Sequence, residues 1–244
     1  MLRDLKQLNE FTGTVRRCAD DFGMIDEGDG VAVGVSGGKD SLVLLLALRH
    51  LQSYYPKAFR LEAVTLDLGF EGMDFSPIAQ LCAEIGVEYT LIKTDIREIV
   101  FDIRREENPC SLCSKMRRGA LNDAIKARGL NKLALGHHFD DAVETFFMSL
   151  FYEGRLSCFK PATYMSRADV WQIRPLLYAE EEKIAALAKH YELPLVHNPC
   201  PQDKGSKRHE IKTLVATLAK DYPDLKNKVF GAMKRLPLDG WGSE

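Results

Sequence analysis

The most chemically suggestive segment of this 244-residue chain is the hexapeptide Ser36–Ser41, which reads Ser-Gly-Gly-Lys-Asp-Ser. It follows the apolar run Val31–Val35 and precedes a second apolar run that is typical of a buried helix. A turn at a helix N-terminus binds anions, because the first helical N–H groups are unpaired and the helix dipole favours negative charge. Glycine also lets the backbone approach a phosphate closely. We therefore predict a phosphate-binding loop, called the glycine loop below, formed by Ser36, Gly37, Gly38, Lys39, Asp40 and Ser41.

Asp40 is the one residue of the glycine loop whose charge would repel a bare phosphate. We predict that it caps the following helix or helps to hold a metal ion. Lys39 supplies a positive point charge, and the two serine hydroxyls supply further hydrogen-bond donors. The spacing is not that of a Walker A loop, in which four residues separate the first glycine from Gly-Lys-Ser/Thr.

A second polar constellation, Gly-His-His-Phe-Asp-Asp at Gly136–Asp141, also stands between an apolar run and a helical pattern. One acid is needed to cap the helix, and we predict Asp140 in that role. Asp141 then remains for magnesium binding or for proton transfer. The two histidines are predicted to be structural. Arg174, which follows a further apolar stretch, either reaches a phosphate or extends to the surface.

Cys110 and Cys113 form a Cys-x-x-Cys pair before a predicted helix rich in basic residues. Two sulfurs at this spacing can hold one metal centre, and we expect the helix dipole and nearby cations to lower the thiol pKa values. The pair alone does not decide between zinc, an iron–sulfur cluster and redox chemistry.

Cys200 stands between two prolines and is the third candidate ligand. Three cysteines suit an iron–sulfur cluster with one iron free of protein ligands, whereas structural zinc takes four ligands. His197 is an available fourth ligand, so zinc remains an alternative. Cys18 and Cys82 have apolar neighbours and are predicted to belong to the core.

Strand-like and helix-like runs alternate along the chain, which predicts an α/β fold with a doubly wound parallel sheet. The predicted strands are Val31–Val35, Leu61–Leu66, Glu88–Ile92 and Lys132–Leu135. The predicted helices are Leu2–Phe22, Asp40–Leu51, Phe75–Ile85, Ser114–Arg128, Asp140–Tyr152, Glu180–His190, Arg208–Lys220 and Asp224–Arg235. Ligands of such sheets bind beyond the carboxyl ends of the strands, so the glycine loop, Asp67 and Gly136–Asp141 should share one edge.

We divide the chain into an N-terminal helix cap (1–28), a nucleotide-binding domain (29–200) and a C-terminal helical extension (201–244). The formal net charge is −2, so any nucleic-acid surface must be local. Basic residues gather in two stretches, and a solvated face is the ordinary interpretation of such runs. The candidate RNA-binding residues among them are Lys115, Arg117, Arg118, Lys207 and Arg208, with Lys204 and Lys212 nearby.

The chain begins with charged residues that are unlike a signal peptide, and its longest apolar stretch, Leu42–Leu48, is too short to span a bilayer. We therefore expect a cytoplasmic protein without membrane contacts, whose six cysteines are reduced.

The glycine loop resembles the PP-loop of the ATP pyrophosphatases. Four further elements follow it in order, namely Asp67, Cys110-Ser-Leu-Cys113 with Arg117-Arg118-Gly119, Gly136–Asp141, and Arg174-Pro-Leu; Cys200 completes the set. Together they resemble the TtcA family, the tRNA 2-thiocytidine synthetases, from about residue 12 to about residue 235. In contrast to the usual family pattern, His197 replaces the first cysteine of a second Cys-x-x-Cys pair.

The resemblance implies an adenine nucleotide α-hydrolase-like fold and a sulfurtransferase that forms AMP and pyrophosphate. Such an enzyme adenylates a cytidine C2 oxygen in the tRNA anticodon loop and replaces it with sulfur. The implied cofactors are ATP, Mg²⁺ held by Asp40 and Asp141, and a 4Fe–4S cluster on Cys110, Cys113 and Cys200. The implied nucleotide contacts are the whole glycine loop, Asp67 and Gly136, with Lys39, Asp141 and the three cysteines as catalytic residues.

The implied partners are tRNA and a sulfur donor, either a cysteine desulfurase or sulfide, and the resemblance leaves a homodimer open. Two alternatives remain. The first is a PP-loop iron–sulfur enzyme that thiolates or desulfurates another base. The second is a zinc-containing module that binds nucleotide or tRNA without turnover.

Overall fold

The computed structural model describes residues 6–105, 109–200, 207–236, 238–239 and 241. A six-stranded sheet has the order β3-β2-β1-β4-β6-β5. All neighbouring strands are parallel except β5 and β6, which form an antiparallel hairpin at one edge. The strands are β1 (Gly30–Gly34), β2 (Arg60–Asp67), β3 (Glu88–Lys93), β4 (Lys132–Ala134), β5 (Ala162–Met165) and β6 (Val170–Ile173).

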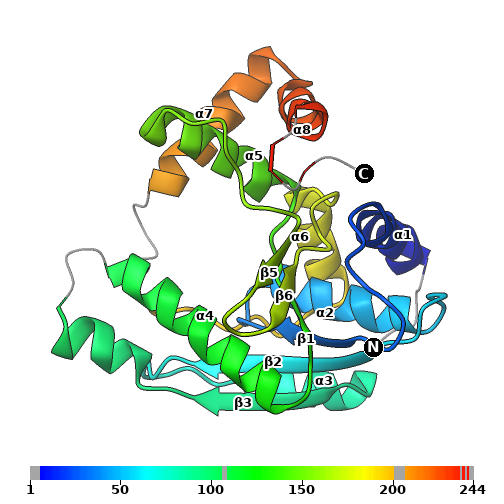
Figure 1. Cartoon of the computed structure of the whole chain (residues 1–244), viewed down its shortest axis with the longest axis vertical. Helices are drawn as coiled ribbons and strands as arrows, with labels where there is room; N and C mark the ends of the chain where they lie inside the picture. Colours follow the sequence, from blue (N-terminus) through cyan, green and yellow to red (C-terminus); the bar gives the residue numbers. More distant parts are fainter. Residues whose placement is uncertain (1–5, 106–108, 201–206, 237, 240, 242–244) are drawn as a thin grey trace.

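Helices cover both faces of the sheet, which confirms the predicted doubly wound α/β fold (Figure 1). The α-helices are α1 (Lys6–Asp21), α2 (Lys39–Gln52), α3 (Ser76–Ile85), α4 (Pro109–Ala127), α5 (Phe139–Met148), α6 (Glu181–His190), α7 (Lys207–Asp221) and α8 (Leu225–Arg235). Two π-helical segments, η1 (Glu98–Ile103) and η2 (Ser149–Glu153), complete the described helices.

The two faces of the sheet carry separate cores. In β1, Val31 and Val33 point into the larger core, whereas Ala32 points into the smaller one, as the alternation of side chains along a strand requires. The larger core takes in α2, whose apolar residues are buried all round because α1, α6, β1 and β2 surround the helix. The smaller core lies under α4, which packs on β2, β4 and β6.

The C-terminal helices stand away from the sheet. In Figure 1, α5, α7 and α8 gather at the end of the molecule opposite β3, and α5 contacts both α7 and α8. Phe230 of α8 joins the larger core beside Phe139 of α5, with ring centroids 4.8 Å apart. Within the described ranges, no helix combines the length and apolar character needed to cross a membrane.

The predicted parallel strands are confirmed with small shifts of their ends, and two predictions about elements need correction. The hairpin β5–β6 lies outside our prediction, because β5 is an edge strand without a buried residue and its sequence Ala-Thr-Tyr-Met has no apolar run. The predicted helix from Ser114 begins five residues earlier, at Pro109, since proline is well accommodated in a first helical turn. Both cysteines of the Cys-x-x-Cys pair therefore lie inside α4.

Candidate functional site

The glycine loop joins β1 to α2 and is held in shape by its own two serines. Ser41 Oγ donates to the carbonyl oxygen of Gly38 at 2.9 Å and accepts from the amide of Ser36 at 3.2 Å. Gly37 has a φ of 86°, a conformation that favours glycine. Gly38 is the N-cap of α2 and, among the described residues, no side chain caps this helix start. The first amides of α2 are therefore available to an anion.

Two close backbone approaches bring distant segments against the glycine loop. A Cβ atom on Gly136 would lie 3.1 Å from the Asp40 carbonyl carbon and from the Ser41 nitrogen, so only glycine lets the segment after β4 lie so close. A Cβ atom on Gly37 would lie 2.8 Å from the Cβ of Val196. The Val196 amide also donates to the Gly37 carbonyl oxygen at 3.0 Å. The segment leading to Cys200 is thereby fastened onto the glycine loop.

Lys39 lies in a chain of ion pairs that the sequence analysis did not find. Its ammonium contacts Asp40 at 2.9 Å and Glu181 of α6 at 3.1 Å, and Glu181 also pairs with Lys212 of α7 at 2.6 Å. Burial opposes the ionisation of Glu181, but the two lysines have the larger combined effect and lower its pKa to about 2. Burial acts likewise on Lys39, and its two carboxylates raise its pKa. A Glu at the start of a helix is normally explained by its favourable interaction with the helix dipole. The sequence therefore gave no sign that Glu181 pairs with two lysines.

The N-termini of α5 and α2 are not capped by the carboxylates that we predicted as caps. His138, not Asp140, is the N-cap: its Nδ1 accepts from the Asp141 amide at 3.4 Å, and Asp141 Oδ2 accepts from the His138 amide at 3.1 Å. Asp40 does not cap α2 either, because its carboxylate pairs with Lys39. The His138 Nε2 atom faces both Asp40, at 3.8 Å, and Asp141, at 3.4 Å.

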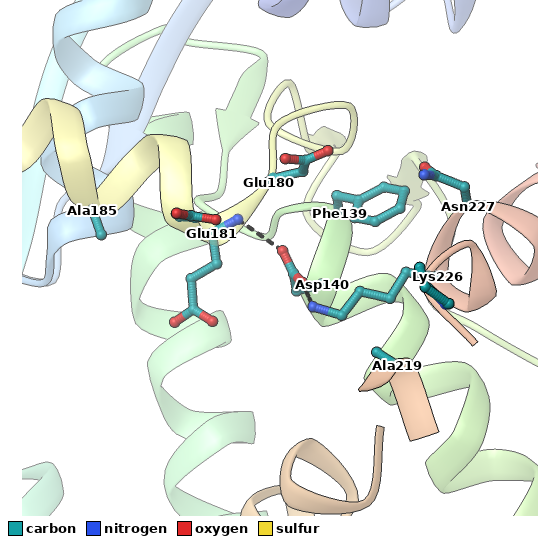
Figure 2. A pocket seen from close by; sticks show the side chains of 10 residues that line it. Phe139, Asp140, Glu180, Glu181, Ala185, Ala219, Lys226 and Asn227 are labelled. Carbon is teal, nitrogen blue, oxygen red and sulfur yellow. Dashed lines mark hydrogen bonds and ion pairs between the residues drawn. The ribbon is translucent and has the colours of Figure 1, made fainter. Parts of the chain in front are cut away.

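Asp140 and Asp141 both form ion pairs with basic residues of the C-terminal helices. Asp141 pairs with Arg208 of α7 at 2.6 Å. The buried Asp140 accepts from the Glu181 amide at 2.7 Å and pairs with Lys226 of α8 at 2.6 Å. Figure 2 shows Asp140 between Lys226 and the first turn of α6, in a cavity of about 490 Å³. The C-terminal helices are thus tied electrostatically to the edge that carries the glycine loop.

Glu144, one turn further along α5, is a buried acid that the sequence analysis missed. Burial raises its pKa to about 7, since desolvation and the charges of Asp141 and Glu181 outweigh the attraction of Lys212 and Arg208. Asp67 ends β2 at the same edge of the sheet, and its Oδ1 accepts from the Gly69 amide at 2.9 Å. Two of the three predicted edge elements, the glycine loop and Gly136–Asp141, are in direct contact.

Cys110 and Cys113 lie near the start of α4, and Cys200, on the segment that follows Val196, is close enough to Cys113 to affect it electrostatically. The thiol of Cys113 has a raised pKa because of burial first, against the lowering effect of Arg117, with further increases from Cys200 and Cys110. This corrects our expectation of a lowered pKa for this thiol. No group of three His, Cys, Asp or Glu side chains in the described part of the chain is arranged around a single metal position.

The remaining cysteines fall outside this group. Cys18 and Cys82 are fully buried in the larger core, as predicted. Cys158 donates to the Ala142 carbonyl oxygen at 3.4 Å. His197, the alternative zinc ligand, is exposed and lines a shallow cavity with Glu71 and Asp74.

The predicted basic residues divide into two kinds. Lys115, Arg117 and Arg118 of α4 are exposed. Arg208 instead turns its guanidinium group onto Asp141 and Thr145, and Lys207 lies over the Tyr152 ring at 4.8 Å. Lys204 lies outside the described residues. The buried Arg174 does not extend to the surface; it lies beside the rings of His137 and Phe159.

Comparisons with known proteins agree with this geometry. A family model described as a PP-loop domain matches residues 7–218. A tRNA-cytidine(32) 2-sulfurtransferase of Syntrophotalea carbinolica is 37% identical over 234 residues, which cover 95% of this chain and 89% of the relative. Its counterpart in Geobacter sulfurreducens is 38% identical over 222 residues, with 90% and 86% covered.

A solved structure extends the likeness to three dimensions. The U34-tRNA thiolase of Methanococcus maripaludis, solved with its 4Fe–4S cluster, aligns with a TM-score of 0.74 at 28% identity. The alignment covers 91% of this chain and 77% of that one.

Proposed function

This chain belongs to the PP-loop family and within it to the tRNA-cytidine 2-sulfurtransferases, and on that basis we propose that it is an ATP-dependent enzyme that places sulfur at C2 of cytidine 32 in tRNA. The observation that supports this most is the position of Cys200. The segment before it is fastened onto the glycine loop at Gly37, while its thiol influences Cys113 electrostatically. This connection supports a site in which the glycine loop binds the nucleotide and the three thiols lie nearby.

The residues of this edge fit ATP and magnesium. The free amides at the start of α2, the Gly37 backbone and Lys39 suit a polyphosphate. Asp40 and Asp141 face the same imidazole, so both carboxylates point into one space, and carboxylate oxygens are the ligands that Mg²⁺ prefers. Holding the ATP phosphates and the metal at this point is a matter of positioning and charge neutralisation.

The three cysteines fit an iron–sulfur cluster. Burial is the main cause of the raised Cys113 pKa, and the nearby Cys200 and Cys110 raise it further, so a positively charged metal centre would favour the ionised Cys113 thiol. Cys110, Cys113 and Cys200 would hold a 4Fe–4S cluster. When bound, the cluster supplies an iron site free of protein ligands at which sulfur for transfer can be carried.

Activation of the base precedes sulfur transfer in the reaction we propose. The cytidine O2 atom attacks the α-phosphorus of ATP, the bond to the β-phosphate breaks, and pyrophosphate leaves. The C2 carbon then carries AMP as a good leaving group. Hydrosulfide attacks C2, the C2–O bond breaks, AMP leaves, and loss of the S–H proton gives the thiocarbonyl; when a cysteine desulfurase supplies the sulfur as a persulfide, a thiol reductant must first release it as hydrosulfide. Lys39 stabilises the charge on the departing pyrophosphate, and Arg208 holds Asp141 beside the metal site.

The test combines anaerobic purification with analysis of tRNA nucleosides. We expect a brown protein that contains iron and converts cytidine to 2-thiocytidine only when ATP is present. Cys200→Ser should lose most of its iron and all thiolation. Cys158→Ala, which removes a sulfur to which we assign no role, should retain its iron.

Three outcomes would contradict the proposal. Colourless protein that contains zinc and shows no turnover would favour the binding module. Thiolated uridine without thiolated cytidine would reassign the target base, for which the U34-tRNA thiolase neighbour provides a precedent. Loss of sulfur from a thiolated tRNA would indicate desulfuration.

A further inference from the structure

A cavity of about 330 Å³ lies between α4 and the carboxyl ends of β4 and β6, next to the cysteines of α4. We call it the α4 cavity. Ser114 and Arg117 line it, and Arg117 interacts electrostatically with Cys113. The full lining is Ser114, Arg117, Arg118, Leu121, Leu133, Leu135, His137, Phe159, Gln172 and Arg174. Three arginines and a histidine contribute to this lining, and no carboxylate does.

Arg174 is a buried cation without a carboxylate partner among the described residues. It is 7% exposed, and its Nη1 donates to the Lys160 carbonyl oxygen at 2.6 Å. Its guanidinium lies 5.0 Å from the centre of the Phe159 ring. The Nε atom is buried and has no hydrogen-bond partner in the described structure. Because burying an unpaired donor is costly, this N–H group calls for an acceptor from a ligand.

His137 supplies a second buried nitrogen in the same cavity. Its Nδ1 atom likewise lacks a partner within the described ranges, and its ring lies 5.0 Å from that of Phe159. Burial, with the nearby charge of Arg174, lowers the pKa of His137 to about 4. The imidazole is therefore neutral at neutral pH, so one of its ring nitrogens is an acceptor.

The shape and walls of the cavity favour a planar base over a free phosphate. Three leucines and Phe159 form apolar walls, which suit a flat heterocycle and not a fully solvated anion. A second cavity, of about 490 Å³, adjoins the first through the shared Arg118 and is also lined by Lys115, Tyr164 and Arg167. Cations and an exposed aromatic ring beside a base-sized cavity are what a single RNA strand requires.

We propose that the α4 cavity receives the unstacked target base and selects cytosine over uracil, with Arg174 Nε–H donating to N3 and His137 Nδ1 accepting from the N4 amino group. The proposal rests on the proposed function and deepens it. Uracil presents the opposite pattern, since its N3 is a donor and its O4 an acceptor. Its N3–H would face the Arg174 Nε–H, which is always a donor, and its O4 could pair with His137 only in the other imidazole tautomer. In this pose O2 and C2 remain at the mouth, and the neighbouring cavity holds the flanking phosphates.

The first experiment locates the base in the unaltered protein. An anticodon stem-loop hairpin with 5-iodocytidine at the target position is bound to the wild-type chain, irradiated, and the linked peptide is sequenced. We expect a crosslink to Phe159 or to α4. A crosslink confined to other elements would overturn the proposal, even if the protein makes 2-thiocytidine.

The second experiment measures discrimination by equilibrium binding, without turnover. Matched hairpins with cytidine or uridine at the target position are titrated by fluorescence anisotropy. We expect the wild type to prefer cytidine by about tenfold or more. His137→Leu should reduce that preference to about twofold or less. Arg174→Met should weaken binding of the cytidine hairpin about tenfold, and Arg174→Gln, which keeps a donor, should recover part of that loss.

Arg16→Met is the matched control, because Arg16 is an exposed arginine of α1 far from the cavity, and it should bind both hairpins like the wild type. Unchanged discrimination in folded His137→Leu would contradict the assignment. If an Arg174 variant fails to fold, the crosslink and the binding preference of His137→Leu still test the proposal. If binding and crosslinking behave as expected but no 2-thiocytidine forms, the proposed function is wrong and the base pocket stands.

Discussion

The glycine-loop edge and the α4 cavity lie side by side, yet they treat charge in opposite ways. At the edge, each cation of the loop network meets a carboxylate: Lys39 and Lys212 share Glu181, Arg208 pairs with Asp141, and Lys226 pairs with Asp140. In the α4 cavity, Arg117, Arg118 and Arg174 have no acidic partner in the lining. The ion pairs of the edge stabilise the folded protein without a ligand. The arginines of the α4 cavity instead keep hydrogen-bond donors that a ligand can pair with.

The largest effect should come from removing Lys39, the cation of the glycine loop for which we propose contact with the ATP phosphates. In Lys39→Ala, we expect release of AMP and pyrophosphate to fall about 100-fold or more, because preorganised charge at a reacting phosphate contributes several kcal/mol. Thermal stability should change little, since its ion pairs are partly solvated. Retention of a tenth of the wild-type rate would contradict this role, and Lys57→Ala on the surface serves as control.

Charge reversal in the α4 cavity should separate tRNA binding from ATP chemistry. The double variant Arg117→Glu, Arg118→Glu should bind tRNA about tenfold or more weakly, with a shallower salt dependence, because it replaces two exposed cations by anions that repel the RNA backbone. Hydrolysis of ATP without tRNA should change by less than about threefold. Equal losses in both assays would show that the two regions do not divide the work in this way.

The stabilising role of the paired charges can be measured at Asp140. Asp140→Asn leaves Lys226 and the start of α6 without their buried acceptor charge, so we expect a loss of about 2 kcal/mol in the free energy of unfolding. Asp239→Asn removes a comparable ion pair, with Lys160, but at an exposed carboxylate, and should cost less than about 0.5 kcal/mol. Urea titrations of both variants make the comparison, and similar losses would contradict it.

The smallest expected effect is the change with pH in the stability contributed by Glu144, a buried acid whose desolvation outweighs the attraction of nearby cations. Its pKa is raised from 4.5 to about 7, so its contribution to stability is present below about pH 4.5 and is lost as the pH rises through 7. Glu144→Gln should therefore be more stable than the wild type by about 1 kcal/mol at pH 8, and the difference should vanish near pH 4.

Glu181 provides the internal contrast to Glu144, because its pKa is lowered to about 2. The stability that it contributes is present above its ordinary pKa of 4.5 and is lost as the pH falls towards 2. In urea titrations across pH, Glu181→Gln should lose stability at neutral pH relative to the wild type and match it in acid. A Glu144→Gln difference that grows as the pH falls would show that the sign of our argument is wrong.

Local signals in the sequence were enough for the strands that carry the site. The β-branched run before Ser36 and the all-apolar helix after it define a strand, a turn and a helix without reference to the rest of the chain. The same holds for Gly136–Asp141. Parallel strands have their carboxyl ends at one edge of the sheet. Two segments that each follow a predicted parallel strand are therefore expected at that edge.

Contacts between distant segments were beyond such reasoning. Asp140 pairs with Lys226, 86 residues further along the chain, and Asp141 pairs with Arg208, 67 residues further along. The residues around α5 give no sign of either partner. The position of Glu181 between two lysines, and the burial that sets the pKa values of Cys113 and Glu144, likewise come from packing.

Residue type and short spacing are enough to predict the type of fold, the glycine loop and the three candidate thiols. Tertiary packing is needed to establish that the Cys200 segment contacts Gly37, that Asp140 pairs with a C-terminal helix, and that Arg174 is buried with no carboxylate partner among the described residues. Desolvation and pairing are properties of the surroundings of a group, and those surroundings exist only once the chain has folded.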